Sequence, residues 1–114
     1  REQREAAIIE FYRAILTPIA EEYLALWQDR TGLRCREWHT KKMKTRWGSC
    51  NVKTHHININ LALYEKGPEC LEYVVVHEMC HILEASHNKI FWGYVAQYFP
   101  DWKNVRARLN EEGV

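Results

Sequence analysis

The residues best suited to chemistry are two histidines four positions apart, His77 and His81, with Glu78 beside the first. On a helix, side chains four positions apart lie one above the other, so both imidazoles can bind one metal ion while Glu78 lies one position round. Zinc held by neutral histidines takes a third protein ligand and keeps one position for water, whose pKa it lowers towards neutrality. The spacing therefore predicts a zinc site with Glu78 as a proton carrier.

The helix that carries this motif is expected to begin near Glu69 and to end around residues 84–86. Two histidines and a glutamate are costly among apolar neighbours unless something compensates them, and a metal ion would do so. Hydrogen-bonded core histidines are the alternative, but they leave Glu78 without a partner. A further helix is expected at residues 89–99, and a helical turn or two at residues 101–110. The apolar positions of the motif helix are Leu71, Val74, Val75, Met79, Ile82 and Leu83.

Three residues compete to be the third ligand. His87 follows His81 by six positions, a spacing typical of zinc sites in which the chain turns back after the helix. Such sites usually have a glycine midway; Glu84 stands there, so the turn must form without glycine, through Ala85-Ser86. Glu84 is the rival ligand, but three successive turns of one straight helix converge poorly on one ion. Cys80 is a possible thiolate ligand, although its position suits a small core residue better.

The first part of the chain should form one long helix, because apolar residues recur at helical spacing over residues 2–29. Thr17-Pro18 interrupts the pattern. Proline removes a donor and crowds the preceding turn, so the helix should kink there or restart with Thr17 as its cap. Thr31-Gly32 should end it. The expected core stripe consists of Ile8, Phe11, Tyr12, Ile15, Ile19, Tyr23, Leu26 and Trp27.

A small sheet is expected between this helix and the motif helix. In the last of its strands Ile57, Ile59 and Leu61 alternate with polar residues, which is typical of a strand with one face in the core. Residues 51–54 are the expected turn, and Gly48 indicates a bulge or a place where another backbone or a ligand comes close. The segments with strand character are residues 33–39, 44–49 and 55–61.

Length and composition indicate one small folded domain. The chain has 114 residues, of which 46% are hydrophobic and 27% charged. We therefore expect a single domain over residues 1–114, and because no initiator methionine is present we expect it to be cut from a longer protein. Neither composition nor pattern indicates an oligomeric state.

The cysteines and the charge bear on the compartment and the partners. The cysteines are spread singly, without the spacing of a zinc ribbon or a disulfide scaffold, so we expect reduced thiols and a cytoplasmic protein. No apolar stretch is long enough to span a bilayer, and a net charge of +1 gives no overall attraction to membranes or nucleic acid. No membrane partner is therefore expected. The four cysteines are Cys35, Cys50, Cys70 and Cys80.

One basic cluster, residues 41–47, contains an aromatic residue, Trp47, and is the only argument in the sequence for contact with nucleic acid. Solvated lysines near a sheet edge are the ordinary explanation, and the acidic first helix leaves no extended positive face. His39, His55 and His56 have no partner at metal spacing and are interpreted as surface or edge residues.

From about Lys44 to Trp102 the chain resembles the YgjP-type zinc metallopeptidase-like proteins, relatives of SprT-like, WLM-type and other zincin-fold peptidases. Residues 46–50, Arg-Trp-Gly-Ser-Cys, are similar to a segment of that family, and residues 73–81 to its active-site helix. Ile57, Asn60 and Leu63 also fit its pattern, as does His87 followed by Phe91-Trp92. The chain departs from it at Met79, where leucine is usual, and in the order Ser86-His87-Asn88; Asn88 can still cap the next helix.

The resemblance implies an α+β, zincin-like metallopeptidase core with a long N-terminal helix, a small antiparallel-rich sheet, the motif helix and C-terminal helices. It also implies His77, His81 and His87 as ligands of one zinc ion and Glu78 as the catalytic glutamate. We expect the family activity, hydrolysis of a peptide bond in a peptide or protein substrate, with Glu78 taking a proton from water and passing it to the leaving amine.

An extended substrate is expected to bind at the edge of the sheet. The candidates for a residue that would assist the metal as an electrophile are Arg46, Tyr94 and Tyr98. The alternative function is a zinc-stabilised module that binds protein or nucleic acid without peptidase activity, in which the metal would be closed on all sides by protein.

Overall fold

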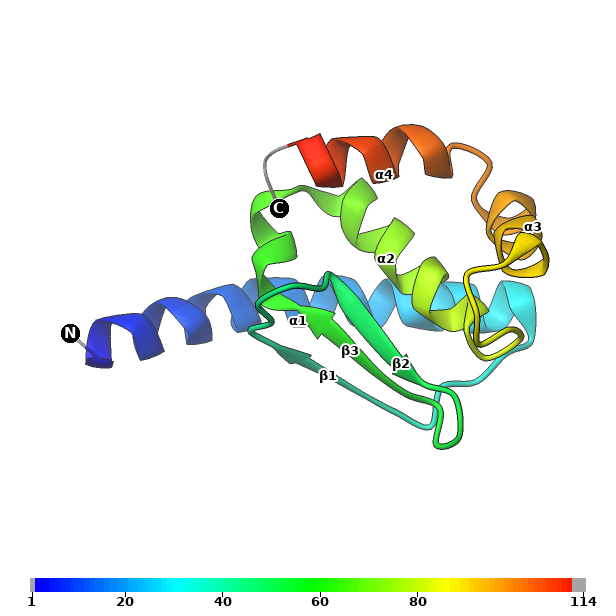
Figure 1. The fold of residues 1–114 in the computed structure, drawn as a ribbon. Coiled ribbons are helices and arrows are strands. Elements are labelled where there is room, and N and C mark those ends of the chain that lie inside the picture. The colour runs from blue at the N-terminus through cyan, green and yellow to red at the C-terminus, as the bar shows by residue number, and fades with distance from the viewer. Residues whose placement is uncertain (1, 112–114) are drawn as a thin grey trace.

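The structure is a computed structural model that describes residues 2–111. It has the expected α+β order of a long helix, a small sheet, the motif helix and C-terminal helices (Figure 1). No helix within these residues is long and apolar enough to cross a membrane. The elements are α1 (Glu2–Thr31), β1 (Glu37–Lys41), β2 (Gly48–Asn51), β3 (His56–Asn60), the 3-10 turn η1 (Leu61–Glu65), α2 (Pro68–Cys80), α3 (Lys89–Tyr98) and α4 (Trp102–Glu111).

The sheet has the strand order β1-β3-β2, with β3 in the centre. β3 pairs with β2 as an antiparallel hairpin and with β1 in parallel, because the hairpin inserts β3 between the two earlier strands. The sheet is therefore mixed, and the expected antiparallel character holds for one of its two pairings. Ile57 and Ile59 of β3 are fully buried, as the predicted alternation requires, but Asn60 of the polar set is buried as well. β2 forms one edge of the sheet.

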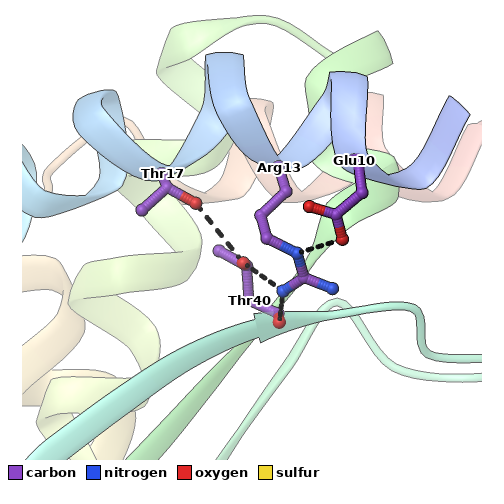
Figure 2. A network of polar contacts seen from close by, with 4 residues as sticks. All are labelled: Glu10, Arg13, Thr17 and Thr40. Atoms are coloured by element: carbon purple, nitrogen blue, oxygen red, sulfur yellow. Dashed lines mark hydrogen bonds and ion pairs between the residues drawn. The ribbon is translucent and has the colours of Figure 1, made fainter. Parts of the chain in front are cut away.

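Helix α1 runs unbroken through Pro18, so the predicted restart at Thr17 is wrong. The hydroxyl of Thr17 instead lies 3.4 Å from that of Thr40 on β1. Arg13 adds to this attachment, since its Nη1 donates to the carbonyl and the hydroxyl of Thr40 at 2.6 and 3.1 Å and its Nε donates to Glu10 (Figure 2). One cluster of side chains thus holds α1 against the sheet in the turns that precede Pro18.

The core face of α1 agrees with the predicted stripe in part: Trp27 is buried, and half-buried side chains pack against the core at Tyr12, Ile19 and Tyr23. Leu16, Ala20, Leu24 and Trp27 are buried, and the Trp27 indole donates a 2.7 Å hydrogen bond to Glu72 of α2. The first turns of α1 project beyond the rest of the molecule (Figure 1), so apolar side chains there have little to pack against. Those of the predicted stripe that are exposed are Ile8, Phe11, Ile15 and Leu26.

Helix α2 crosses the centre of the fold and contacts α1, α3, α4, β2 and β3. It is buried on most sides, as predicted, but it ends at Cys80 rather than at residues 84–86. The last turn tightens, because the N–H groups of His81, Ile82 and Leu83 each bond to the carbonyl three residues earlier. Helix α3 begins where expected, with Asn88 as its cap: the side chain accepts the Phe91 N–H at 3.0 Å. The tail forms a ten-residue helix, α4, longer than the predicted turn or two.

Candidate metal centre

Three histidine rings converge at the C-terminal end of α2. The Nε2 atom of His87 lies 3.2 Å from that of His77 and 3.0 Å from that of His81. In a tetrahedral site with Zn–N bonds of about 2.0–2.1 Å, two ligand nitrogens are separated by about 3.3 Å. The three imidazoles therefore fit one metal ion, and within residues 2–111 they form the only such group of potential ligands.

The chain returns to the end of α2 through a turn without glycine. Outside the glycines, residues 2–111 have a positive φ only at His55, so Ala85-Ser86 needs no left-handed backbone. The carbonyl of Glu84 accepts a hydrogen bond from His81 Nδ1 at 3.1 Å, and its carboxylate accepts the N–H of Ser86 at 3.2 Å. Glu84, the rival ligand in the sequence, thus shapes the loop that presents His87.

The Nδ1 atoms of the two helical histidines have partners of their own. That of His77 lies 3.1 Å from the hydroxyl of Tyr73, and that of His81 lies 3.1 Å from the carbonyl of Glu84. When Nδ1 carries the proton and donates it, the Nε2 lone pair is free for a metal. Tyr73 was missed in the sequence, although its position four residues before His77 places it on the same helix face.

Burial keeps His77 and His81 in the neutral form that a metal requires. It lowers the pKa of His77 to about 3, with smaller effects from the neighbouring charges of His81, His87 and Arg106. The pKa of His81 is lowered as well, again chiefly by burial. Protons therefore compete weakly for these two rings near neutral pH.

Glu78 is almost entirely buried, with 5% of its surface exposed, yet it lines the same cleft as the histidines. Burial raises its pKa to about 8, while the charge of Arg46 acts in the opposite direction. Among residues 2–111 no group hydrogen-bonds to its carboxylate. A carboxyl group with a pKa near neutrality can both accept and return a proton.

Gly48 brings the edge strand directly against this glutamate. A Cβ atom at position 48 would lie 2.9 Å from Val74 Cγ1 and 3.0 Å from Glu78 Cγ and from the carbonyl oxygen of Asn58. At 2.9 Å the Val74 side chain would have to shift, and 3.0 Å is tighter than most Cβ contacts, so glycine lets β2 pass close to α2 without displacing its neighbours. The close approach predicted for Gly48 is confirmed, and the approaching groups belong to α2 and β3.

The cleft around the site has a volume of about 500 Å³. Of the three candidates for an electrophilic helper, Arg46 lines it, whereas Tyr94 and Tyr98 do not. Arg106 of α4 also lines the cleft. The sequence analysis did not identify it, because it is far from the histidines in sequence and only the tertiary fold brings it to the cleft. The lining comprises Thr45, Arg46, Trp47, Gly48, Ser49, Cys50, Val52, Tyr73, Val74, His77, Glu78, His81, Ala85, His87, Arg106, Leu109 and Asn110.

An aromatic stack supports the exposed third histidine. The His87 ring lies on Trp92 with 5.8 Å between ring centroids, and Trp92 lies on Trp102 at 4.5 Å. Phe91 stacks on His81 at 4.4 Å. The aromatic pair at the start of α3 therefore packs against two of the three imidazoles.

The cysteines lie outside the histidine cluster. Cys80 is 2% exposed in the core, and burial raises its pKa to about 12, as expected of a core residue. Cys50 lines the cleft, and burial raises its pKa to about 12 too, with a smaller effect of Glu78. None of the four cysteines is in a disulfide.

Comparisons with known proteins agree with this picture. The sequence matches the family described as YgjP-like, metallopeptidase domain, over residues 1–112. None of the curated proteins matches the chain in sequence.

Two solved structures of archaeal metallopeptidase zymogens are similar to the chain in fold. Pyrococcus abyssi abylysin has a TM-score of 0.72 and 21% identity, with 82% of this chain and 94% of that chain covered. Methanocaldococcus jannaschii jannalysin has a TM-score of 0.62 and 20% identity, with 86% of this chain and 96% of that chain covered. At such identities the likeness supports the fold.

Proposed function

Since the chain belongs to the YgjP-like metallopeptidase family, we propose that it hydrolyses peptide bonds at one zinc ion held by His77, His81 and His87. The observation that carries the proposal is the convergence of three Nε2 atoms, with that of His87 3.2 Å from His77 and 3.0 Å from His81, beside a Glu78 carboxylate to which no group of residues 2–111 hydrogen-bonds. Three histidines leave one tetrahedral position for water or substrate, as in catalytic zinc sites. This supports an enzyme over a module with a closed structural metal.

Zinc, when bound, would polarise the scissile carbonyl and lower the pKa of a water molecule. Glu78 takes the proton from the attacking water on a carboxylate oxygen and passes it to the nitrogen of the leaving amine. The buried position of Glu78 beside Gly48 keeps its carboxylate at one place in the cleft. Tyr73 and the Glu84 carbonyl orient the helical imidazoles by accepting their Nδ1 protons.

The edge strand β2 is the proposed docking place for an extended substrate. The Asn60 N–H donates to the carbonyl of Trp47, which makes these two residues a hydrogen-bonded pair of the antiparallel ladder. In such a ladder, bonded and non-bonded pairs alternate, so the backbone groups of Gly48 and Cys50 face away from β3. A substrate chain pairs with these free groups and lies along the cleft.

We further propose a cytoplasmic location, because none of the four cysteines is in a disulfide and thiols persist in reducing compartments.

The experiment that tests the function compares the parent protein with Glu78→Gln. Both should contain about one equivalent of zinc after purification, whereas only the parent should cleave an unfolded protein, and a chelator should abolish that cleavage. Equal cleavage by both proteins would overturn the role of Glu78. Metal without cleavage in either protein would favour the binding module.

A further inference from the structure

Arg106 is a cation of the cleft that the proposed chemistry does not use. Its guanidinium carbon lies 5.3 Å from the ring centroid of Trp92, the residue that stacks on His87. It lines the same cleft as the candidate ligands His77 and His87. The indole face therefore holds the guanidinium beside the metal centre.

The fork of Arg106 is free for a ligand, in contrast to its neighbour on α4. Arg108 forms an ion pair with Glu69, whereas within residues 2–111 no carboxylate pairs with Arg106. An arginine stacked on an aromatic face keeps the N–H groups at its edge available, and these match the two oxygens of a carboxylate.

The charge of the cleft also favours a ligand with a carboxylate group. Among the described residues that line it, Glu78 is the only carboxylate, against the two guanidinium groups of Arg46 and Arg106. Arg106 comes from α4 and lies over Trp92, so the described lining of the cleft carries more positive charge than Glu78 can balance.

We propose that Arg106 binds a carboxylate group of the substrate and selects peptides that carry one near the scissile bond. This proposal rests on the proposed function, because it places a peptide in the cleft. The carboxylate has two sources: the C-terminus of a peptide, or the side chain of an aspartate or glutamate. Both present two carboxylate oxygens to the guanidinium. A C-terminal amide removes the first source, and replacing the acidic residue by its amide removes the second.

The test uses the zinc-loaded protein and one peptide sequence prepared in three forms: with a free C-terminus, with a C-terminal amide, and with the amide and one glutamine replaced by glutamate near the cleavage site. A free C-terminus or a glutamate should raise kcat/KM at least about tenfold over the neutral peptide, as charge-assisted hydrogen bonds do. The form that gains identifies the source of the carboxylate. The preference should shrink at high salt.

Arg106→Gln should reduce this preference to about one, and Arg106→Lys should retain only part of it, because lysine lacks the planar fork. Lys103→Gln is the matched control. Lys103 is also a cation on α4, over the ring of Trp102 at 5.6 Å, but it does not line the cleft. Its removal changes the net charge of the helix equally and should leave the preference intact.

A binding measurement separates this proposal from the proposed function. Calorimetry with zinc-loaded Glu78→Gln should give at least about tenfold tighter binding of the preferred charged peptide than of the neutral one, and adding Arg106→Gln should abolish the difference. This result stands even if no peptide is cleaved. Equal binding and equal turnover of all three peptides, or an undiminished preference in Arg106→Gln, would overturn the role of Arg106.

Discussion

The hydroxyl of Tyr73 lies 3.1 Å from Nδ1 of His77, one helical turn later on the same face of α2. Tyr73 is 3% exposed, so this hydrogen bond is shielded from water. When the hydroxyl accepts the Nδ1 proton, the Nε2 lone pair of His77 is available beside His87. The helix thus supplies two candidate ligands and the group that orients one of them.

Tyr73→Phe removes only this hydroxyl, and we expect zinc affinity to fall about ten- to a hundredfold, the usual effect of losing a partner behind a ligand. Competition with a chromophoric chelator measures the affinity. Tyr98→Phe is the control, because Tyr98 packs on Trp27 away from the cleft. Equal zinc affinities for the two variants would show that the Tyr73 contact does not support the metal.

Gly48→Ala should impair hydrolysis more than stability. The new methyl group would press on Glu78 Cγ and Val74 Cγ1, so the carboxylate or the strand must move. We expect a destabilisation of about 1–3 kcal/mol, typical of overpacking, and a loss of activity of about tenfold or more. Thermal unfolding and kcat/KM measure the two effects.

The matched control for Gly48→Ala is Gly93→Ala on α3, where no atom lies within 4 Å of the added Cβ. Alanine favours the helix over glycine by about 0.5–1 kcal/mol, so this variant should be slightly more stable and fully active. If Gly48→Ala behaved like the control, the close approach of β2 to α2 would not position Glu78.

The candidate site could be predicted from the sequence because its members lie close together along the chain. His77 and Glu78 lie in α2, His81 is its C-cap and His87 follows six residues later, so helical geometry and spacing suffice to group them. Arg106 lies on another helix and joins the cleft only through tertiary packing. No local pattern points to it.

Parts of the fold escaped prediction for a related reason. The apolar stripe of α1 was identified by residue type, yet small Ala20 is fully buried while the larger Phe11 is 54% exposed. Burial there depends on where the rest of the domain ends, not on the residue. Likewise, β1 pairs in parallel with β3 because the β2–β3 hairpin places β3 between β1 and β2. No residue pattern within a single strand predicts this order.

His87→Ala tests which residue completes the ligand set. Loss of one of three ligands should lower zinc affinity more than a hundredfold, which is the upper limit expected when a residue that only hydrogen-bonds to a ligand is lost. The protein should purify largely metal-free, with a lower melting temperature that added zinc restores poorly. Glu84→Gln is the control and should keep a full equivalent of zinc. The reverse pattern, with metal lost only in Glu84→Gln, would assign the carboxylate instead of His87.

The last prediction concerns the effect of pH on the metal-free protein. Burial raises the pKa of Glu78 from 4.5 to about 8, so between these values the folded protein binds more protons at this group than the unfolded chain. Stability must then fall as pH rises. His77 has the opposite effect, since burial lowers its pKa from 6.5 to about 3, and stability is lost as pH falls below 6.5.

Of Glu78 and His77, only Glu78 makes the stability depend on pH between pH 6.5 and 8. The metal-free parent should lose up to about 2 kcal/mol of unfolding free energy across this interval, because each pH unit contributes at most about 1.4 kcal/mol for one proton. Glu78→Gln cannot ionise and should show a flatter curve. Denaturant unfolding at several pH values gives the comparison, and added zinc should reduce the loss in the parent because a cation stabilises the ionised carboxylate. Parallel curves for the two metal-free proteins would mean that Glu78 is not held in a desolvated position.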